Sequence, residues 1–357
     1  MASSRDPWLD NAKMALVLLV VVGHSWALLP SDSTGHQLYD FLYLWHMPAF
    51  VLISGYLSRG FVYDGRRFWQ LVRTLLVPYL VFEAALAAFR VYVGGEQLRD
   101  LWADPHFPLW YLLALCVWRL LVPIFRPLPG ALLVAVGISL VGGFVGGDAA
   151  RMLDLARILG FLPFFVVGLK ATPERLAWLR GRFPAALGVV ALGGLWVLAV
   201  NIDRWGETAY LYYRPYDILE APVAPVVLTR LFVIAAGLVG ALAFLALVPA
   251  RDGWFARMGS ATMIVYLFHG FAIKGAEYAG FKEWAADSPV LGLLAATVGA
   301  VSLALFLASP PVRRLLRPVV DPFEVAEKGL REAVDLTVVV HQELQTEQAS
   351  EGVLAGR

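Results

Sequence analysis

The chain has 357 residues, of which 59% are hydrophobic and only 16% are charged. Soluble domains carry about 45–50% apolar and about 25% charged residues, so this composition excludes a disordered chain and argues against a soluble enzyme. The net charge of +1 gives no basic bias towards nucleic acid, and Cys116 alone provides neither a disulfide framework nor a cysteine metal cluster. The composition predicts a protein that uses lipid as its solvent.

Ten apolar segments are long enough, at about 17–25 residues, to cross the hydrocarbon core as helices. They lie at residues 12–30, 39–58, 69–93, 107–125, 130–147, 153–169, 184–200, 225–249, 260–280 and 289–308. The sequence therefore predicts an all-α polytopic membrane protein, with a bundle of ten transmembrane helices in residues 1–308. Residues 309–357 are expected to form a polar cytoplasmic tail that is amphipathic at 324–336.

The distribution of Lys and Arg predicts the orientation of the helices. With ten spans both termini lie on one side, and most Lys and Arg residues near the helix ends fall on that side. The positive-inside rule places this side in the cytoplasm. Because Arg far outnumbers Lys, as in proteins from GC-rich bacterial genomes, we expect a multi-pass protein of a bacterial inner membrane.

The first predicted helix carries ionisable residues at membrane depth, where each costs roughly 2.5–3.5 kcal/mol and indicates a function. Lys13 and His24 are eleven residues apart, so they share one helix face and are separated by about 16 Å. Asp10 lies on nearly the same stripe, one turn before Lys13. A neutral histidine is a suitable general base. The plain alternative is a histidine that is hydrogen-bonded to a neighbouring hydroxyl or carbonyl.

Two further histidines are predicted near the same depth. His46 lies in the second helix, and His269 lies in the ninth, where Tyr266 is its i, i+3 neighbour. Three histidines at one level indicate a central polar cavity, and a three-histidine metal site is the alternative. We expect no metal, because no carboxylate or cysteine accompanies them at ligand spacing. In the second helix, Ser54-Gly55 permits close approach of another helix.

Basic residues gather at the second cytoplasmic boundary, where Arg66 and Arg73 are predicted to share a helix face. A cluster of guanidinium groups there suits a phosphate-bearing ligand, although positive-inside anchoring explains Arg67 equally well. Arg119 lies near a helix end and is expected to snorkel to the interface. Arg230, in contrast, is a candidate for lining the cavity.

Aromatic residues are the last candidates for binding. Trp110 and Tyr111 begin the fourth predicted helix and form either an interfacial belt or a wall on which a sugar stacks. The loop 201–221 is rich in Tyr and charge. It is expected either to cover an extracytoplasmic opening or to anchor at the interface.

Several segments, taken in order along the chain, resemble one known family. They are RDPWLDNAK, VVVGH, WHMPAFVLISGY, the RR…R…LLVPY stretch, PLWYLLAL and YLFHG. Across residues 5–270 their order and spacing are similar to those of the integral-membrane acyltransferase-three family, and within it to the fucose-4-O-acetylase-like branch. Ten helices is also the usual count of that family.

This resemblance implies an enzyme that moves an acyl group, usually acetyl, from cytoplasmic acyl-CoA to a hydroxyl of a sugar, envelope glycan or glycolipid. The first-helix motif of the family, a basic residue followed after ten residues by a histidine, falls on Lys13 and His24. Many members have arginine where this chain has Lys13. The basic residues beside the third helix fall on Arg66, Arg67 and Arg73 as contacts for the CoA phosphates. We expect no extracytoplasmic esterase-like domain, so the acceptor is modified directly or through a separate partner.

On this interpretation His24 is the general base or forms an acyl-histidine intermediate, while Lys13 and Asp10 orient the site or bind the co-substrate. Candidates for binding the acceptor or stabilising an oxyanion are His46, Ser54, Trp110, Tyr111, Tyr266 and His269. Two other hypotheses stand beside this one. A polytopic transporter for a glycolipid or small solute would also use buried histidines, and a non-catalytic scaffold would need none of them.

Overall fold

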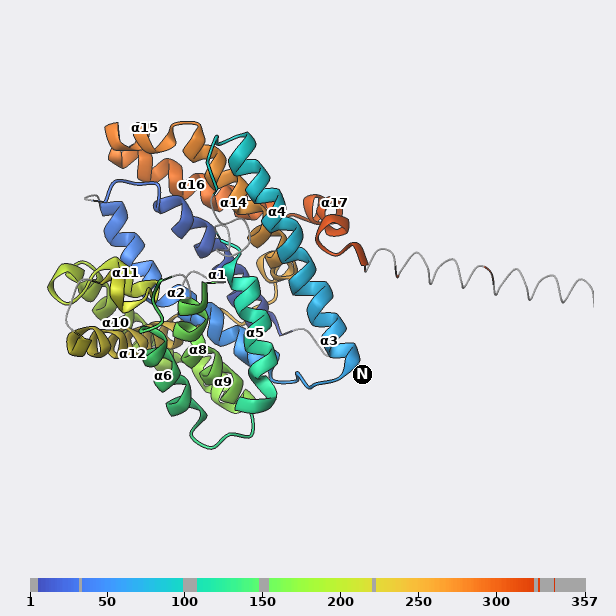
Figure 1. Ribbon diagram of the computed structural model, residues 1–357, viewed down its shortest axis with the longest axis vertical. Coiled ribbons are helices and arrows are strands. Elements are labelled where there is room, and N and C mark those ends of the chain that lie inside the picture. Colours follow the sequence, from blue (N-terminus) through green and yellow to red (C-terminus); the bar gives the residue numbers. More distant parts are fainter. Residues whose placement is uncertain are drawn as a thin grey trace, which may run out of the picture. The chain divides into compact units, whose positions relative to one another are not determined.

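A computed structural model describes residues 6–31, 34–98, 108–147, 154–219 and 223–323, together with Glu327 and Thr337. Within these ranges the regular elements are helices (Figure 1). The chain divides into a first unit, Met1–Arg313, and a second unit, Arg314–Arg357. Apart from Glu327, the predicted amphipathic stretch at 324–336 lies outside the described residues.

Every apolar segment predicted above coincides with a helix. The main helices are α1 (Pro7–Trp26), α2 (Thr34–Ser58), α4 (Val77–Tyr92), α5 (Trp110–Phe125), α6 (Ala131–Gly142), α8 (Leu155–Lys170), α10 (Arg182–Ala199), α12 (Val223–Leu247), α14 (Thr262–Tyr278) and α16 (Pro289–Ala308). Shorter elements are α3 (Gly65–Leu71), η1 (Val72–Leu76), α9 (Pro173–Leu179), η3 (Ile202–Arg204), α11 (Thr208–Leu211), η4 (Tyr216–Ile218), α13 (Trp254–Met258), η5 (Gly259–Ala261), α15 (Phe281–Asp287) and α17 (Pro310–Val320). The prediction of an all-α polytopic membrane protein is confirmed.

The number of membrane spans is a separate question from the number of helices. In the described ranges five helical segments are long and apolar enough to cross a bilayer, and α8 with α9, bent by 101°, would make a sixth. The others are shorter than a full span, as α6 is, or carry several polar residues, as α1 does. The count of ten spans therefore stays a prediction.

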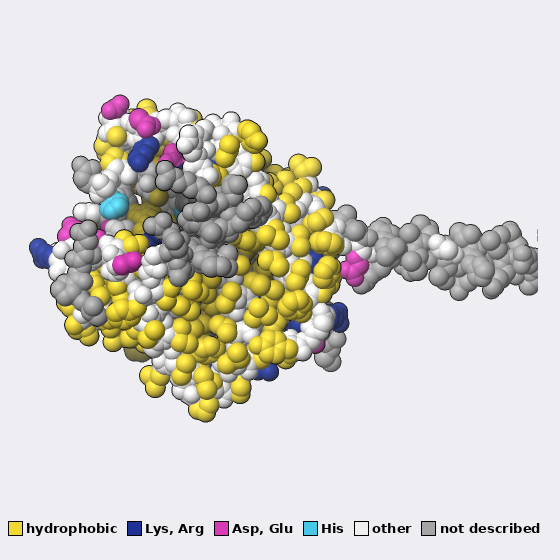
Figure 2. All heavy atoms as spheres, in the orientation of Figure 1, with side chains coloured by type: hydrophobic (Ala, Val, Ile, Leu, Met, Phe, Trp, Pro, Cys, Tyr) yellow, Lys and Arg dark blue, Asp and Glu magenta, His cyan; other side chains and the backbone are white. Residues whose placement is uncertain are grey.

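Lipid contact explains the surface of the first unit. Large apolar side chains on α10 and α16 are exposed, among them Val190, Val290 and Val298. Figure 2 shows hydrophobic side chains over a broad area of the visible face, with few charged side chains among them. Such a surface suits hydrocarbon rather than water.

Helix α2 lies at the centre of the first unit, packed against α1, α5, α8, α10 and α12. Its closest approach is to α8, where two glycines bring the backbones together. A methyl group on Gly55 would overlap the carbonyl oxygen of Phe165, and one on Gly168 would overlap that of Leu52. The close approach predicted at Ser54-Gly55 is thus present, with α8 as the partner, and it is of the kind seen between membrane helices with small residues.

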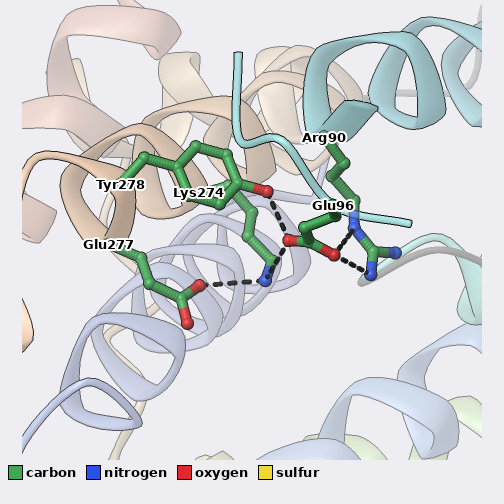
Figure 3. Close-up of polar contacts among 5 residues, drawn as sticks. All are labelled: Arg90, Glu96, Lys274, Glu277 and Tyr278. Atoms are coloured by element: carbon green, nitrogen blue, oxygen red, sulfur yellow. Dashed lines mark hydrogen bonds and ion pairs between the residues drawn. The ribbon is translucent and has the colours of Figure 1, made fainter. Parts of the chain in front are cut away.

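A cluster of charges joins the ends of α4 and α14, and we call it the Glu96 clasp (Figure 3). Arg90 on α4 donates to Glu96 Oε2 from Nε at 2.9 Å and from Nη2 at 2.5 Å. On α14, Lys274 Nζ and Tyr278 Oη donate to Glu96 Oε1 at 3.2 and 2.5 Å. Lys274 also pairs with Glu277 at 2.9 Å, as the i, i+3 spacing predicts. The clasp fixes the segment after α4 to the end of α14.

We expect Glu96→Gln to lower the stability of the protein, by about 1–3 kcal/mol at neutral pH, because Arg90 and Lys274 lose a charged acceptor. Burial acts to raise the pKa of Glu96, but hydrogen bonds from Arg90, Tyr278 and Lys274 outweigh it and lower the pKa from 4.5 to about 2. Ionised Glu96 thus stabilises the folded state above about pH 4.5. Its contribution is lost as the pH falls from 4.5 towards about 2.

Thermal unfolding of the purified protein in detergent, followed from pH 7 downwards, measures this effect. The difference in melting temperature between wild type and the Gln variant should shrink as the pH falls below 4.5. A difference that stays constant across that range would contradict the role given to the clasp.

Candidate active site

Helix α1 places three of the predicted site residues along one stripe. Asp6 caps the helix by accepting from Trp8 N at 3.1 Å, and Pro7 starts it. One turn further, Lys13 Nζ pairs with Asp10 Oδ1 at 2.7 Å, in agreement with the stripe expected from their spacing. The side chains of Lys13 and Asp10 are 28% and 13% exposed, so Lys13 is neutralised by a partner that is largely buried.

A cavity opens beside Lys13. Its wall is mostly apolar, and it is lined by Lys13, Leu16, Phe50, Ile53, Ser54, Leu57, Leu75, Tyr111, Leu112, Leu115, Arg119, Thr262, Met263 and Tyr266. A much smaller space adjoins His24 and is lined by Val20, His24, Met47, Phe50, Pro108, Trp110, Tyr111 and Tyr266. We call them the wide lobe and the His24 lobe. Phe50, Tyr111 and Tyr266 belong to both lining sets, so the two lobes adjoin.

Histidine side chains gather beside the His24 lobe. The rings of His24 and His269 are stacked, with centroids 5.3 Å apart and an interplanar angle of 27°. His269 Nδ1 lies 2.7 Å from the Tyr266 carbonyl oxygen, and because a carbonyl only accepts, Nδ1 carries the proton. His269 Nε2 is then an acceptor, and it is buried with no hydrogen-bond partner among the described residues. It is the kind of group that a substrate hydroxyl can satisfy.

The Tyr43 ring lies between the rings of His46 and His24. The Tyr43 ring is 4.6 Å from the His46 ring and 6.3 Å from the His24 ring. His46 Nδ1 donates to the Leu42 carbonyl at 2.8 Å, within α2. Within the described part of the chain, no three His, Cys, Asp or Glu side chains are grouped to hold a metal ion. The three histidines therefore lie close together among the described residues without being grouped as a ligand set. Only His24 lines a lobe, and that lobe is mostly apolar rather than the polar cavity expected.

Tyr43 was missed by the sequence interpretation, although it lies three residues before His46 on the same predicted helix. Its hydroxyl is 3.2 Å from His24 Nδ1, so it holds one edge of the imidazole ring. A second tyrosine reaches this place from the 201–219 segment. The Tyr212 ring is 5.3 Å from that of Tyr43, and its hydroxyl bonds to that of Tyr39. The described part of the 201–221 loop thus packs against the N-terminal half of α2, and whether it covers an opening stays a prediction.

Given the resemblance to an acyltransferase family, we expect Tyr43→Phe to slow acyl transfer about two- to tenfold, because one hydrogen bond of about 0.5–1.5 kcal/mol no longer orients the His24 ring. The measurement is the initial rate of transfer in membranes that contain equal amounts of each variant. Since phenylalanine keeps the ring contacts of Tyr43, the melting temperature should stay close to that of wild type. A rate equal to wild type would remove Tyr43 from the site.

The remaining aromatic and hydroxyl candidates face inwards. Trp110 and Tyr111 are buried, with 9% and 5% of their surface exposed, so they do not form an interfacial belt. The Tyr111 hydroxyl bonds to that of Ser54, and Ser54 Oγ also donates to the Phe50 carbonyl at 2.9 Å. The Tyr266 hydroxyl donates to the Pro108 carbonyl at 2.5 Å. All four side chains line one lobe or both.

The predicted phosphate contacts lie elsewhere. Arg66 and Arg67 are exposed on α3, and Arg73 is half-buried in η1. None of the three lines the wide lobe or the His24 lobe. A role at the mouth of the site stays a prediction for these residues.

Two arginines lie where the sequence interpretation did not place them. Arg119 lines the wide lobe, where the sequence interpretation had not placed it, and its snorkelling stays a prediction. It follows Leu112 and Leu115 on one helical stripe, which is the signal that could have identified it. Arg230 is buried, and it donates to the Ser139 and Arg214 carbonyls and lies 4.4 Å from the Tyr216 ring. It lines neither lobe, so the expectation that it borders the cavity is wrong.

Comparison with known proteins identifies the family. The family model described as "Acyltransferase domain" matches residues 6–309. The chain is 27% identical over 336 residues to nodulation protein NolL of Sinorhizobium fredii, covering 87% of this chain and 88% of that protein. It is 23% identical over 316 residues to nodulation protein NolL of Mesorhizobium japonicum, covering 79% and 80%. No solved structure matches. The chain therefore belongs to the integral-membrane acyltransferase-three family and is a membrane acyltransferase.

Proposed function

We propose that the protein is an O-acyltransferase that takes an acyl group from acyl-CoA on the cytoplasmic side, and that this group is acetyl. The acceptor is a hydroxyl of a sugar, envelope glycan or glycolipid. The observation that carries this proposal is the adjoining pair of lobes that leads from Lys13 to His24 past Phe50, Tyr111 and Tyr266. The apolar wall of the wide lobe suits the pantetheine chain of CoA, and its cationic side chains suit a phosphate.

The geometry supports a single proton-coupled displacement at His24. The imidazole accepts the proton of the acceptor hydroxyl as the oxygen attacks the thioester carbonyl. The carbon–sulfur bond then breaks, and the proton passes from His24 to the leaving CoA sulfur, so that His24 is neutral again. In the alternative path a His24 nitrogen attacks the thioester carbonyl, the carbon–sulfur bond breaks, and the imidazole proton passes to the sulfur. The acyl group then moves from this nitrogen to the acceptor oxygen, whose proton returns to the imidazole.

Neighbouring side chains supply hydrogen bonds to this reaction. We assign acceptor binding to His269, whose Nε2 is an unsatisfied buried acceptor, with Trp110 as a stacking surface. His46 and Tyr43 support the His24 side of the site. Tyr111 and Tyr266 line both lobes and Ser54 lines the wide lobe, so we propose them for stabilising an oxyanion. In that role each hydroxyl exchanges its present acceptor for the oxyanion.

The orientation follows from the basic residues at the helix ends. We place both termini in the cytoplasm, in the inner membrane of a bacterium, with the 201–219 segment on the opposite side. Acyl-CoA then enters beside Lys13, and the acceptor approaches from the side of Tyr212. The acceptor receives the acyl group there directly, or a separate extracytoplasmic partner carries it further.

The test uses inverted membrane vesicles and acetyl-CoA labelled in the acetyl group or, in a parallel sample, in the adenine. Acyl transfer predicts that the acetyl label becomes bound to glycan or lipid as an alkali-labile ester, while the adenine label stays soluble. Vesicles without the protein are the control. Movement of a labelled glycolipid without any acyl-CoA, and with no ester formed, would favour the transporter hypothesis instead.

A further inference from the structure

Two charged residues line the wide lobe, Lys13 and Arg119, and they have different kinds of partner. Arg119 extends from α5, and its Nε donates to the Ser58 hydroxyl at 3.2 Å. No carboxylate in the described ranges forms an ion pair with it, whereas Lys13, across the same lobe, is paired with Asp10 at 2.7 Å. A guanidinium group has five donor hydrogens, and one neutral hydroxyl satisfies only one of them.

This arrangement is costly unless an anion completes it. An arginine within a membrane bundle is expensive, and such residues generally pair with an acid or mark the path of a ligand. Apart from Lys13, the rest of the lobe wall is apolar or neutral and includes Leu57, Leu112, Leu115 and Tyr111. Since Arg119 lines the lobe, a ligand that enters the lobe can reach this guanidinium group, and the fork geometry of the group matches a phosphate.

Helix geometry indicates which phosphate would fit. Arg119 is eight residues from Tyr111 on α5, about 12 Å along the axis, and Tyr111 also lines the His24 lobe. Lys13 is about 16 Å from His24 along α1. The chain of phosphopantetheine, from phosphorus to sulfur, has the length of an extended peptide of four to five residues, about 15 Å. A thioester beside His24 thus places this phosphate at the end of the lobe where Arg119 and Lys13 lie.

We propose that Arg119 binds the phosphate that ends the pantetheine chain of the acyl carrier, and so sets how far the thioester reaches towards His24. This inference rests on the proposed acyl-CoA-dependent transfer and adds the binding residue. Lys13 contributes less to binding this phosphate, since Asp10 already neutralises it.

The experiment compares two probes that differ by this one phosphate. Thermal stabilisation of the purified protein in detergent is measured with 4′-phosphopantetheine and with pantetheine, for wild type and for Arg119→Gln. Wild type should bind the phosphorylated probe about 10- to 100-fold more tightly, which is the effect of losing one or two charge-assisted hydrogen bonds. Arg119→Gln should bind both probes with the affinity that wild type has for pantetheine.

The controls separate the phosphate contact from other effects. Arg126→Gln removes the same charge from the end of the same helix, at an exposed position outside the lobe, and should keep the wild-type preference. Arg119→Lys keeps the charge without the fork and should recover part of the preference. Unchanged pantetheine binding by Arg119→Gln shows that this variant is folded.

Two results would overturn the inference, and they are distinguishable. In the first, wild type prefers 4′-phosphopantetheine, and both Arg119→Gln and Arg119→Lys keep that full preference. The phosphate is then bound elsewhere, and the proposed transfer is unaffected. If wild type binds neither probe and CoA does not stabilise it, acyl-CoA is not its donor, and the proposed function fails together with the inference.

Discussion

Replacing His24 with alanine is expected to reduce acyl transfer from labelled acetyl-CoA by roughly 10²–10⁴-fold, the usual contribution of a positioned general base. The reason lies in the geometry, since His24 borders the smaller lobe and is held by Tyr43 at 3.2 Å and by the stacked ring of His269. A loss of this size with little change in melting temperature would separate chemistry from folding. Rates are compared in membranes with matched protein content.

His36→Ala provides the matched control for this experiment. His36 is on α2, next along the chain, and lies near Asp40 and Thr208, but it lines neither lobe. Its replacement should leave the transfer rate within a few-fold of wild type. Undiminished transfer by His24→Ala would show that His24 is not the general base. An equal loss in His36→Ala would show that the effect is not specific to the site.

The second large effect is expected from the glycines between α2 and α8. Gly168→Ala and Gly55→Ala each place a methyl group on a backbone carbonyl of the facing helix. A backbone atom cannot rotate away as a side chain can, so the helices must separate, at a cost of about 1–3 kcal/mol or more. Because α2 also carries Tyr43, His46 and Ser54, the separation should lower both the melting temperature and the transfer rate.

Gly137→Ala is the control for glycine replacement in a helix. Gly137 lies in α6 with nothing within 4 Å of the added methyl group, so alanine should be neutral there or raise stability by up to about 1 kcal/mol. Melting temperatures of the three variants in detergent measure the contrast. Equal behaviour of Gly137→Ala and Gly168→Ala would mean that the close contact between α2 and α8 does not determine stability.

The positions of the helices could be predicted from the sequence, because a long apolar run indicates a segment that lies in lipid or in the protein interior. Which of these helices span the membrane was harder to predict. Asp10, Lys13 and His24, all candidate site residues, lower the hydropathy of α1, and α14 is only 17 residues long. Mean hydropathy reflects the average environment of a helix, so it identifies a membrane span less clearly where the helix carries charged residues.

The site was predicted best where its residues share one helix. The helical repeat alone relates Asp10 to Lys13, and Tyr266 to His269, and the structure has both pairs as neighbours. The helical repeat does not predict contacts between different helices, such as the one between Ser54 and Tyr111, which are 57 residues apart. Arg119 shows the same limit, since its distance from a helix end is visible in sequence while the lobe beside it is made by other helices.

One wide turn between α3 and α4 bears on how residues of this family are aligned. Val72–Leu76 is π-helical, so it holds an extra residue relative to a regular helix. Everything before it is rotated by about 100° relative to α4. Leu75 in the turn faces the wide lobe, whereas Arg66 and Arg67 before it are exposed. In a relative with a one-residue deletion here, arginines at matching positions would point in another direction, so roles transfer only between chains that keep the same turn.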